Sequence, residues 1–406
     1  MKASSFPKIW IILLVIVLPQ LTETVYTPSL TAIRTDLKVP AEMVEYTLSM
    51  FLLGFSVGML LWGTISDTKG RKPCLLIGMS VYALGCLGCY FSDSVELLLF
   101  WRFVQALGGS SGSVLGNAIT RDAFQGPERG KVFATVFSVM ALSPALGPIV
   151  GGTITQIFSW HYIFIFLCVG ALFAIYSIVH YLPETLQRDT ARSESIATQI
   201  GWLMRDKKVK GFAFMVGCPS GIGFSYYAEG PFYLIEILGI SPTSYSMTFL
   251  FLASTWLVGG YLCKRLQGRL APINILKFGI FTSIAASIIF SSSVIAYYTF
   301  GTPGMSVIMS TIFCMMLVFL AITLIIPSSK TLALDDHQGY IGTATAVFGF
   351  MYYTVASLIS AGMAVLRDGS LIPMPLYFLG ISFAMWVAYQ TVLRPEFKTE
   401  PPSGKL

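Results

Sequence analysis

The chain has 406 residues, of which 55% are hydrophobic and only 11% are charged, whereas about a quarter of the residues in an average soluble domain are charged. This composition excludes an ordinary water-soluble protein and indicates that lipid surrounds most of the surface. The seven cysteines lie mostly in apolar runs, without the spacing of a disulfide framework or a metal site, and the net charge of +6 has to be located before it is interpreted.

Twelve apolar stretches are long enough to cross about 30 Å of hydrocarbon, which takes about 20 helical residues. In chain order we expect spans at 9–30, 45–65, 74–91, 97–117, 132–157, 161–181, 211–238, 245–263, 275–297, 306–326, 340–365 and 375–393. A long polar segment separates six spans from six. We therefore predict an all-α membrane protein with parallel six-helix repeats around a central cavity, divided into an N-terminal bundle, a cytoplasmic linker, a C-terminal bundle and a cytoplasmic tail at 1–182, 183–210, 211–393 and 394–406.

Lysine and arginine are distributed very unequally between the loops. With the amino terminus placed inside, 22 fall in inside loops and tails, three (Arg34, Lys38 and Arg367) fall in outside loops, and Arg102 lies within a span. The positive-inside rule therefore predicts cytoplasmic termini. The net positive charge thus reports topology and gives no reason to expect a nucleic-acid partner.

Two acids fall inside apolar stretches, each near a proline. Glu23 and Glu229 both lie toward the outer half of their spans, where a carboxylate is costly unless it is protonated, paired or in a polar cavity. Nearby aromatic residues (Tyr26 for the first acid, Tyr226 and Tyr227 for the second) would suit amphipathic cations. We predict that proton and substrate compete for Glu229, with Glu23 as its partner or as an alternate site.

Two further acids sit near outer helix ends. Hydration by ordinary water is the simpler explanation for Glu45 and Glu236. Glu45 is nevertheless kept among the candidate proton and substrate ligands.

The loop after the second stretch runs from Gly63 to Lys72 with the sequence GTISDTKGRK. Gly63 allows close helix contact and Gly70 allows a tight reversal. Asp67 could accept hydrogen bonds from a helix amino terminus or from an arginine across the bundle, and so latch a cytoplasmic gate. An ordinary basic turn would explain the cations, Arg71 among them, but not an aspartate beside two glycines.

The fourth stretch contains Arg102, followed at three residues by Gln105. An arginine in hydrocarbon costs at least a few kcal/mol and normally faces a partner in the bundle, so Arg102 is a candidate for a proton or conformational relay. It lies only about 8 Å into its helix. Alternatively, therefore, its side chain could reach the outer headgroups.

The fifth stretch combines prolines with a small-xxx-small face. Gly147 and Gly151 permit close packing, and prolines distort backbone hydrogen bonding. The run consists of Pro144, Gly147, Pro148, Gly151 and Gly152 with apolar residues between them.

These segments together resemble the major facilitator superfamily. The 63–72 loop is similar to its signature loop, the segment from Arg102 is similar to its Arg-x-x-Gln-Gly pattern with two residues between the glutamine and the glycine, and the 144–152 run is the one associated with exporters. The corresponding loop of the second half, 261–269, keeps the glycine and arginine but has Arg265 in place of the acid. This degenerate copy supports duplication and implies an asymmetric gate.

Within the superfamily the chain is most similar to the bicyclomycin-resistance (Bcr/CflA) group of drug and proton antiporters, through 48–55, 120–122, 230–232 and 342–344. Asp122 belongs to one of these segments and is carried over as a gate residue. That group usually has an acid four residues before the first-span proline, where this chain has Thr24. The resemblance implies a monomeric, proton-driven exporter of small amphipathic molecules in the bacterial inner membrane, with no cofactor.

Two other functions fit parts of the sequence. A proton-driven importer or exporter of a specific metabolite or siderophore would use the same fold. An intramembrane serine protease is the more remote alternative, because residues 109–112 read Gly-Ser-Ser-Gly and His180 could act as the base for Ser111. Twelve spans with duplicated gate loops are excessive for such a protease, and we expect no enzymatic activity.

Overall fold

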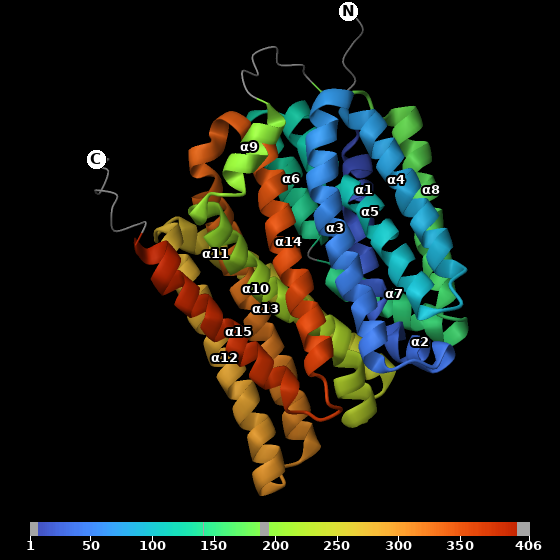
Figure 1. Cartoon of the computed structure of the whole chain (residues 1–406), viewed down its shortest axis with the longest axis vertical. Coiled ribbons are helices and arrows are strands. Elements are labelled where there is room, and N and C mark those ends of the chain that lie inside the picture. The colour runs from blue at the N-terminus through green and yellow to red at the C-terminus, as the bar shows by residue number, and fades with distance from the viewer. Residues whose placement is uncertain (1–6, 141, 187–194, 396–406) are drawn as a thin grey trace, which may run out of the picture.

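The computed structural model describes residues 7–140, 142–186 and 195–395, which are almost entirely helical (Figure 1). The first half contains α1 (Ile9–Val25), α2 (Leu30–Leu37), α3 (Ala41–Lys69), α4 (Arg71–Tyr90), α5 (Val95–Ala123), α6 (Gly126–Met140), α7 (Ser143–Ile157) and α8 (His161–Tyr181). The second contains α10 (Lys207–Pro231), α11 (Pro242–Gln267), α12 (Pro272–Phe300), α13 (Gly304–Leu334), α14 (Ile341–Leu366) and α15 (Pro373–Ala388). Each half packs around its own hydrophobic core, which confirms the two-bundle prediction.

In the described part of the chain, ten helical runs are long and apolar enough to cross a membrane. The runs Ile9–Leu37 and Glu128–Ile157 each join two helices. Two more long helices, α5 and α10, complete the twelve-helix arrangement of this fold. Hydropathy is a weak guide to these two because they carry polar side chains, Arg102 and Glu229 among them, that are buried within the protein.

Several predicted boundaries were wrong. The first span continues beyond residue 30, because a short helical turn, Thr27–Ser29, leads directly into α2, which ends at Leu37. The linker is not uniformly solvated, since it contains α9 (Ile196–Leu203) with Leu203 buried. It also ends before residue 210, because Asp206 accepts hydrogen bonds from two backbone amides and caps α10. Residues 187–194 of the linker and 396–406 of the tail lie outside the described residues.

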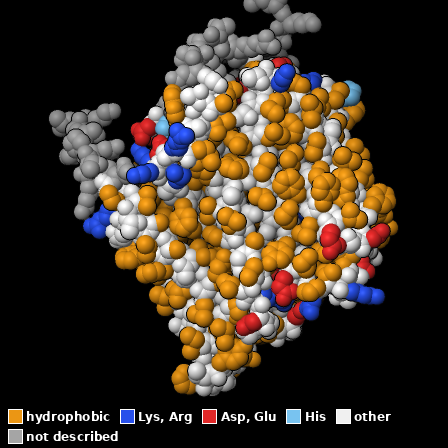
Figure 2. All heavy atoms as spheres, in the orientation of Figure 1, with side chains coloured by type: hydrophobic (Ala, Val, Ile, Leu, Met, Phe, Trp, Pro, Cys, Tyr) orange, Lys and Arg blue, Asp and Glu red, His pale blue; other side chains and the backbone are white. Residues whose placement is uncertain are grey.

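The two ends of the molecule are named here by the chain. The terminal face is the end where α1 begins and α15 leads out, at the top of Figure 1, and the opposite face carries the α4–α5 and α14–α15 connections. In Figure 2, hydrophobic side chains cover the middle of the visible surface, whereas charged side chains gather toward these two ends. This distribution is the one expected of a protein that crosses a bilayer.

The bundles meet along two seams. One is between α3 and α14, which lie side by side in Figure 1, and the other is between α7 and α11. Hydrogen bonds cross the first seam: Ser357 Oγ donates to the Ser49 carbonyl at 2.8 Å, and the hydroxyls of Ser56 and Thr354 lie 3.1 Å apart. Side chains at these seams are therefore in a position to respond when the bundles move relative to each other.

Candidate functional site

Glu23 lies on α1 where the two bundles face each other. Its residue is 4% exposed, and its Oε1 has no hydrogen-bond partner among the described residues. Arg102 of α5, Tyr227 of α10 and Tyr353 of α14 are within electrostatic reach of its carboxylate. Glu23 is therefore a buried acid between bundles, with unused capacity to bind a proton or a cation.

Six aromatic residues form a continuous set of ring contacts, joined through Phe224 and Tyr353 at 6.5 Å, and three of them (Tyr227, Tyr352 and Tyr353) are within electrostatic reach of Glu23. We call this set the aromatic cluster: Phe55, Phe224, Tyr227, Phe319, Tyr352 and Tyr353. The Tyr353 ring lies 4.7 Å from Phe55 and 4.6 Å from Tyr352, measured between ring centres. Tyr227 lies 5.8 Å from Phe224 and 5.9 Å from Phe319. Because Phe55 belongs to the first bundle and the other five to the second, the cluster bridges the bundles and offers ring faces to an organic cation.

Arg102 is completely buried beside this region. Its guanidinium carbon lies 4.4 Å from the ring centre of Tyr26 and 4.3 Å from that of Phe51, and Nη1 donates to Gln105 at 2.7 Å. Nε and Nη2 have no hydrogen-bond partner among the described residues. The alternative in which Arg102 reaches the outer headgroups is thus wrong, and the side chain holds a positive charge inside the bundle near Glu23.

A second buried charged group lies at the opposite face. Arg367, just after α14, places its Nε 3.4 Å from Glu45 of α3 and 3.0 Å from Glu229 of α10. The three side chains are 10%, 0% and 2% exposed, respectively. Hydration of Glu45 by bulk water is therefore wrong. Glu236 does fit that expectation, since its side chain is one-third exposed and pairs with Arg34.

The group of Glu45, Glu229 and Arg367, which we call the acidic clasp, joins the two bundles. Sequence reasoning missed it because Arg367 appeared only as an outside-loop charge and because nothing in the sequence pairs residues so far apart. The signal was available in part: two acids within apolar stretches require a cation, and Arg367 directly follows the eleventh stretch. Glu229 is held in this clasp by Arg367, whereas the charged side chain within electrostatic reach of Glu23 is Arg102.

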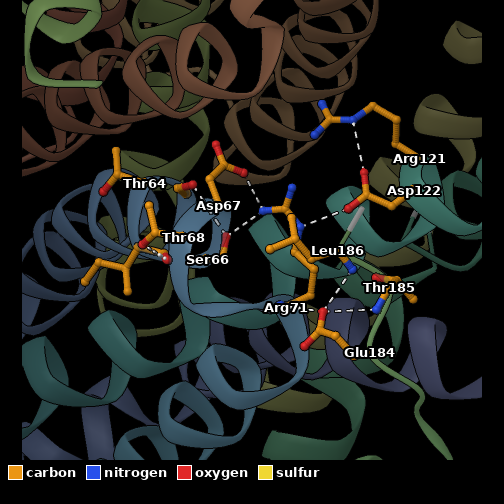
Figure 3. Close-up of polar contacts among 12 residues, drawn as sticks. Thr64, Ser66, Asp67, Thr68, Arg71, Arg121, Asp122, Glu184, Thr185 and Leu186 are labelled. Carbon is orange, nitrogen blue, oxygen red and sulfur yellow. Dashed lines mark hydrogen bonds and ion pairs between the residues drawn. The ribbon is translucent and has the colours of Figure 1, made fainter. Parts of the chain in front are cut away.

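The signature loop forms an ionic network at the terminal face (Figure 3). Arg71 binds Asp67 through Nη1 at 2.7 Å and Asp122 through Nε at 2.9 Å. Its Nη1 also donates to Ser66 Oγ at 2.7 Å. All of these residues belong to the first bundle, so Asp67 is bound by the neighbouring Arg71 within its own bundle.

The acid that accepts hydrogen bonds from a helix amino terminus here is Glu184. The sequence had suggested Asp67 as one candidate for this role. The two carboxylate oxygens of Glu184 accept hydrogen bonds from the backbone amides of Arg71 and Lys72 at 2.9 and 3.1 Å, at the start of α4. Gly70 is required here twice over. Its φ of +105° is unfavourable for other residues, and a Cβ would come within 2.7 Å of the Glu184 carboxylate.

The second bundle approaches this network along α14. A Cβ on Gly63 would lie 2.6 Å from the Cβ of Ala346, so α3 and α14 are in backbone-close contact at this level. One turn further, Gly342 lies beside Asp67 and Arg121: a Cβ there would be 3.7 and 3.6 Å from their charged atoms. The signature loop is therefore closed against the start of α14 in this structure.

The small residues of α7 pack against α1. Gly147 faces Thr24, and Gly151 faces the Val25 carbonyl, so neither position has room for a side chain. Thr24 also donates to the Ser143 carbonyl at 3.2 Å. Hence α7 braces the segment of α1 that carries Glu23.

The remaining residues of this run include two at the second seam. The carbonyl of Pro148 accepts a hydrogen bond from Ser246 of α11 at 3.4 Å, and a Cβ on Gly152 would lie 3.1 Å from the same hydroxyl. Pro144 lies in the first turn of α7, where a missing amide hydrogen costs little. This packing is compatible with either direction of transport.

The two residues proposed for a protease are not brought together. Ser111 is fully buried in α5, where it fills the space beside Gly78 of α4. His180 lies in the exposed last turn of α8, and its Nδ1 is 2.9 Å from the Tyr176 carbonyl.

Two bundles that meet across buried charges and aromatic rings define a secondary membrane transporter. The family profile described as Major Facilitator Superfamily matches residues 12–361. An uncharacterized transporter of Rickettsia bellii is 31% identical over 95% of this chain and 96% of its own. A bicyclomycin resistance protein homolog of Haemophilus influenzae is 31% identical over 65% of this chain and 67% of its own. The chain belongs to the major facilitator superfamily.

A solved structure supports the fold. The xylose transporter of Escherichia coli, in a partially occluded inward-open conformation, matches with a TM-score of 0.72 over 98% of each chain at 14% identity. The matched family and these related proteins are transporters, so the chain is a multi-pass membrane transporter and not an enzyme. The resemblance to the drug and proton antiporter branch is likewise confirmed.

Proposed function

We propose that the protein exports amphipathic cations from the cytoplasm in exchange for protons. The observation that carries this proposal is Glu23: a nearly fully buried carboxylate with an unpartnered oxygen, flanked by the aromatic cluster between the bundles. Relatives named for bicyclomycin resistance and multidrug resistance agree with the export of small organic molecules.

Orientation follows from the charges. The lysines and arginines concentrate in the loops and tails of the terminal face, and this bias assigns that face to the cytoplasm of a bacterial cell. The opposite face, with its few cations, is then outside. Both chain termini are cytoplasmic in this arrangement.

Exchange is a consequence of a single carboxylate that serves two ligands. A buried carboxylate is costly when it is charged and alone, so Glu23 is stable either with a bound proton or with a bound cation. The nearby Arg102 supplies a fixed positive charge that favours the charged carboxylate. Glu23 can therefore release its proton during part of the transport cycle. Because proton and substrate displace each other, flow of one drives flow of the other without both being bound at once.

The acidic clasp and the signature-loop network act as the two gates. The clasp of Glu45, Glu229 and Arg367 holds the bundles together at the outer face, and at the cytoplasmic face the loop around Asp67 packs against the start of α14. In this assignment Glu229 is principally a gate residue, and Glu23 is the principal substrate and proton ligand, which reverses the order expected from sequence. Each gate opens while the other stays closed.

The test is transport in proteoliposomes that contain purified protein and an imposed pH gradient of either sign. Ethidium, an amphipathic cation, should be driven against protons, and Glu23→Gln should abolish that movement while leaving the protein folded. Glu96→Gln alters an exposed acid in the first turn of α5 and serves as the matched control. Ethidium movement in the same direction as protons, or full exchange by Glu23→Gln, would overturn the proposal.

A further inference from the structure

A lysine within the second bundle reaches the aromatic cluster. Lys330 lies on α13, one turn before the helix ends at Leu334, and its Nζ is 5.8 Å from the ring centre of Tyr352. The residue is partly buried, and no carboxylate of the described residues lies within ion-pair distance of it. A partly buried cation near the cytoplasmic end of a bundle is stabilised only in part by a tyrosine ring, so Lys330 retains the capacity to bind an anion.

The turn around Lys330 is polar but lacks internal partners. Ser328 and Ser329 are fully buried, and neither hydroxyl has a hydrogen-bond partner among the described residues. Successive helical positions point in different directions, so these hydroxyls do not all reach one ligand. They show that this turn of α13 carries polar groups that the folded chain itself does not satisfy, which is rare for buried groups.

Lys330 lies on the cluster-facing side of α13. Phe319, whose ring contacts Tyr227, is eleven positions earlier and therefore on the same side of the helix, about 16 Å away along its axis. The Tyr352 ring lies next to the ammonium of Lys330, and its hydroxyl is within electrostatic reach of Glu23. The aromatic cluster thus has a carboxylate beside it in the first bundle and an ammonium beside it in the second, and these two are not paired with each other.

We propose that the transported molecule is an aromatic zwitterion, in which Glu23 binds the cationic centre and Lys330 binds a carboxylate. This inference rests on the proposed function and narrows its substrate class. A simple cation would leave Lys330 uncompensated, whereas a molecule with both charges satisfies both side chains and stacks its rings on the cluster.

Two dyes of the same ring system test the carboxylate requirement. Rhodamine 110 carries a free carboxyl group, and rhodamine 123 is its methyl ester and therefore only a cation. Their dissociation constants would be measured by fluorescence anisotropy on the detergent-solubilised full chain. We expect Lys330→Gln to raise the dissociation constant of rhodamine 110 by about tenfold or more, because one charge-assisted contact is lost. The dissociation constant of rhodamine 123 should change by less than about twofold. Lys330→Arg should preserve the preference for rhodamine 110.

Lys277→Gln is the matched control. Lys277 also lies 5.8 Å from a tyrosine ring, that of Tyr389, but belongs to α12 and lines a separate pocket with Trp386. Lys277→Gln should leave the dissociation constants of both dyes unchanged. If Lys330→Gln weakens the binding of both dyes equally, Lys330 contributes to packing and the inference is overturned. Unchanged binding of rhodamine 110 would also overturn it.

A different result would overturn the proposed function. If Glu23→Gln leaves rhodamine 123 binding intact, the assignment of the cation to Glu23 is wrong, whatever Lys330→Gln does to rhodamine 110. If the parent protein binds neither dye, both proposals are overturned for aromatic substrates.

Discussion

Arg367 and Glu45 pair across the two bundles, with Nε 3.4 Å from a carboxylate oxygen that is buried with the rest of its side chain. Glu229 binds the same Nε at 3.0 Å. Two acids therefore share one arginine, and the Arg367 guanidinium also lies 4.5 Å from the centre of the Phe232 ring. This arrangement makes the clasp depend on a single cation.

Replacing that cation should open the opposite face. Arg367→Gln leaves two buried carboxylates facing each other, and breaking a buried ion pair typically costs about 3–5 kcal/mol. Spin labels at Thr35→Cys and Asp368→Cys, both exposed at this face, should move apart in a double electron–electron resonance measurement. Arg34→Gln removes a partly exposed pair with Glu236, worth about 0–1 kcal/mol, and should leave the distance unchanged. Equal distances in both variants would show that Arg367 does not hold this face closed.

A larger residue at position 63 should open the terminal face. Gly63→Val would place its side chain against Ala346, whose Cβ is 2.6 Å from the position of a Cβ at residue 63. We expect the α3–α14 seam to separate and the distance between spin labels at Thr68→Cys and Thr345→Cys to increase. Gly260→Val in α11, where a Cβ would meet nothing within 4 Å, controls for loss of a helical glycine. If Gly63→Val transports ethidium and keeps the parent distance, close contact here is not needed for closure.

Asp67→Asn keeps the shape of the side chain but removes its charge. Arg71 would retain Asp122 at 2.9 Å, so the chain should fold, while the signature loop would bind its arginine less tightly. The expected result is a broader distribution of Thr68–Thr345 distances, with a shift toward the state open at the terminal face. Asp93→Asn, in the exposed α4–α5 turn, provides a control of the same chemistry. An unchanged distribution together with normal transport would leave Asp67 as a packing or topology residue.

The two buried acids should differ in proton exchange. Substrate-induced proton release from detergent-solubilised protein should be lost in Glu23→Gln, because this carboxylate is the one without a paired cation in contact. Glu229→Gln should retain most of the release and instead slow transport, because Glu229 is held in an ion pair with Arg367 in the clasp. The opposite pattern would restore Glu229 as the proton carrier and assign Glu23 to structure, and release by the double variant would exclude both.

Much of the fold could be predicted from the sequence, because the bilayer imposes a simple requirement. Every span must be a long helix that satisfies its own backbone, so the apolar stretches gave the number and order of the helices. Lysine and arginine in the loops predicted the orientation, and the 63–72 loop identified the family. The boundaries near residues 30 and 207 were less predictable, since a proline-containing turn and a capping aspartate decide them locally.

The partners of the charged residues could not be predicted in this way. Glu45, Glu229 and Arg367 come from three helical segments, and only the packing of α3, α10 and α14 brings them together. Glu184 likewise caps a helix more than a hundred residues away. An electrostatic interaction depends on distance and burial, which the sequence does not contain. The sequence by itself determined that this chain spans a membrane as two bundles of a known family, because hydrophobicity and loop charge act locally. The tertiary structure decided which acid is clasped by an arginine and which one remains open to a ligand.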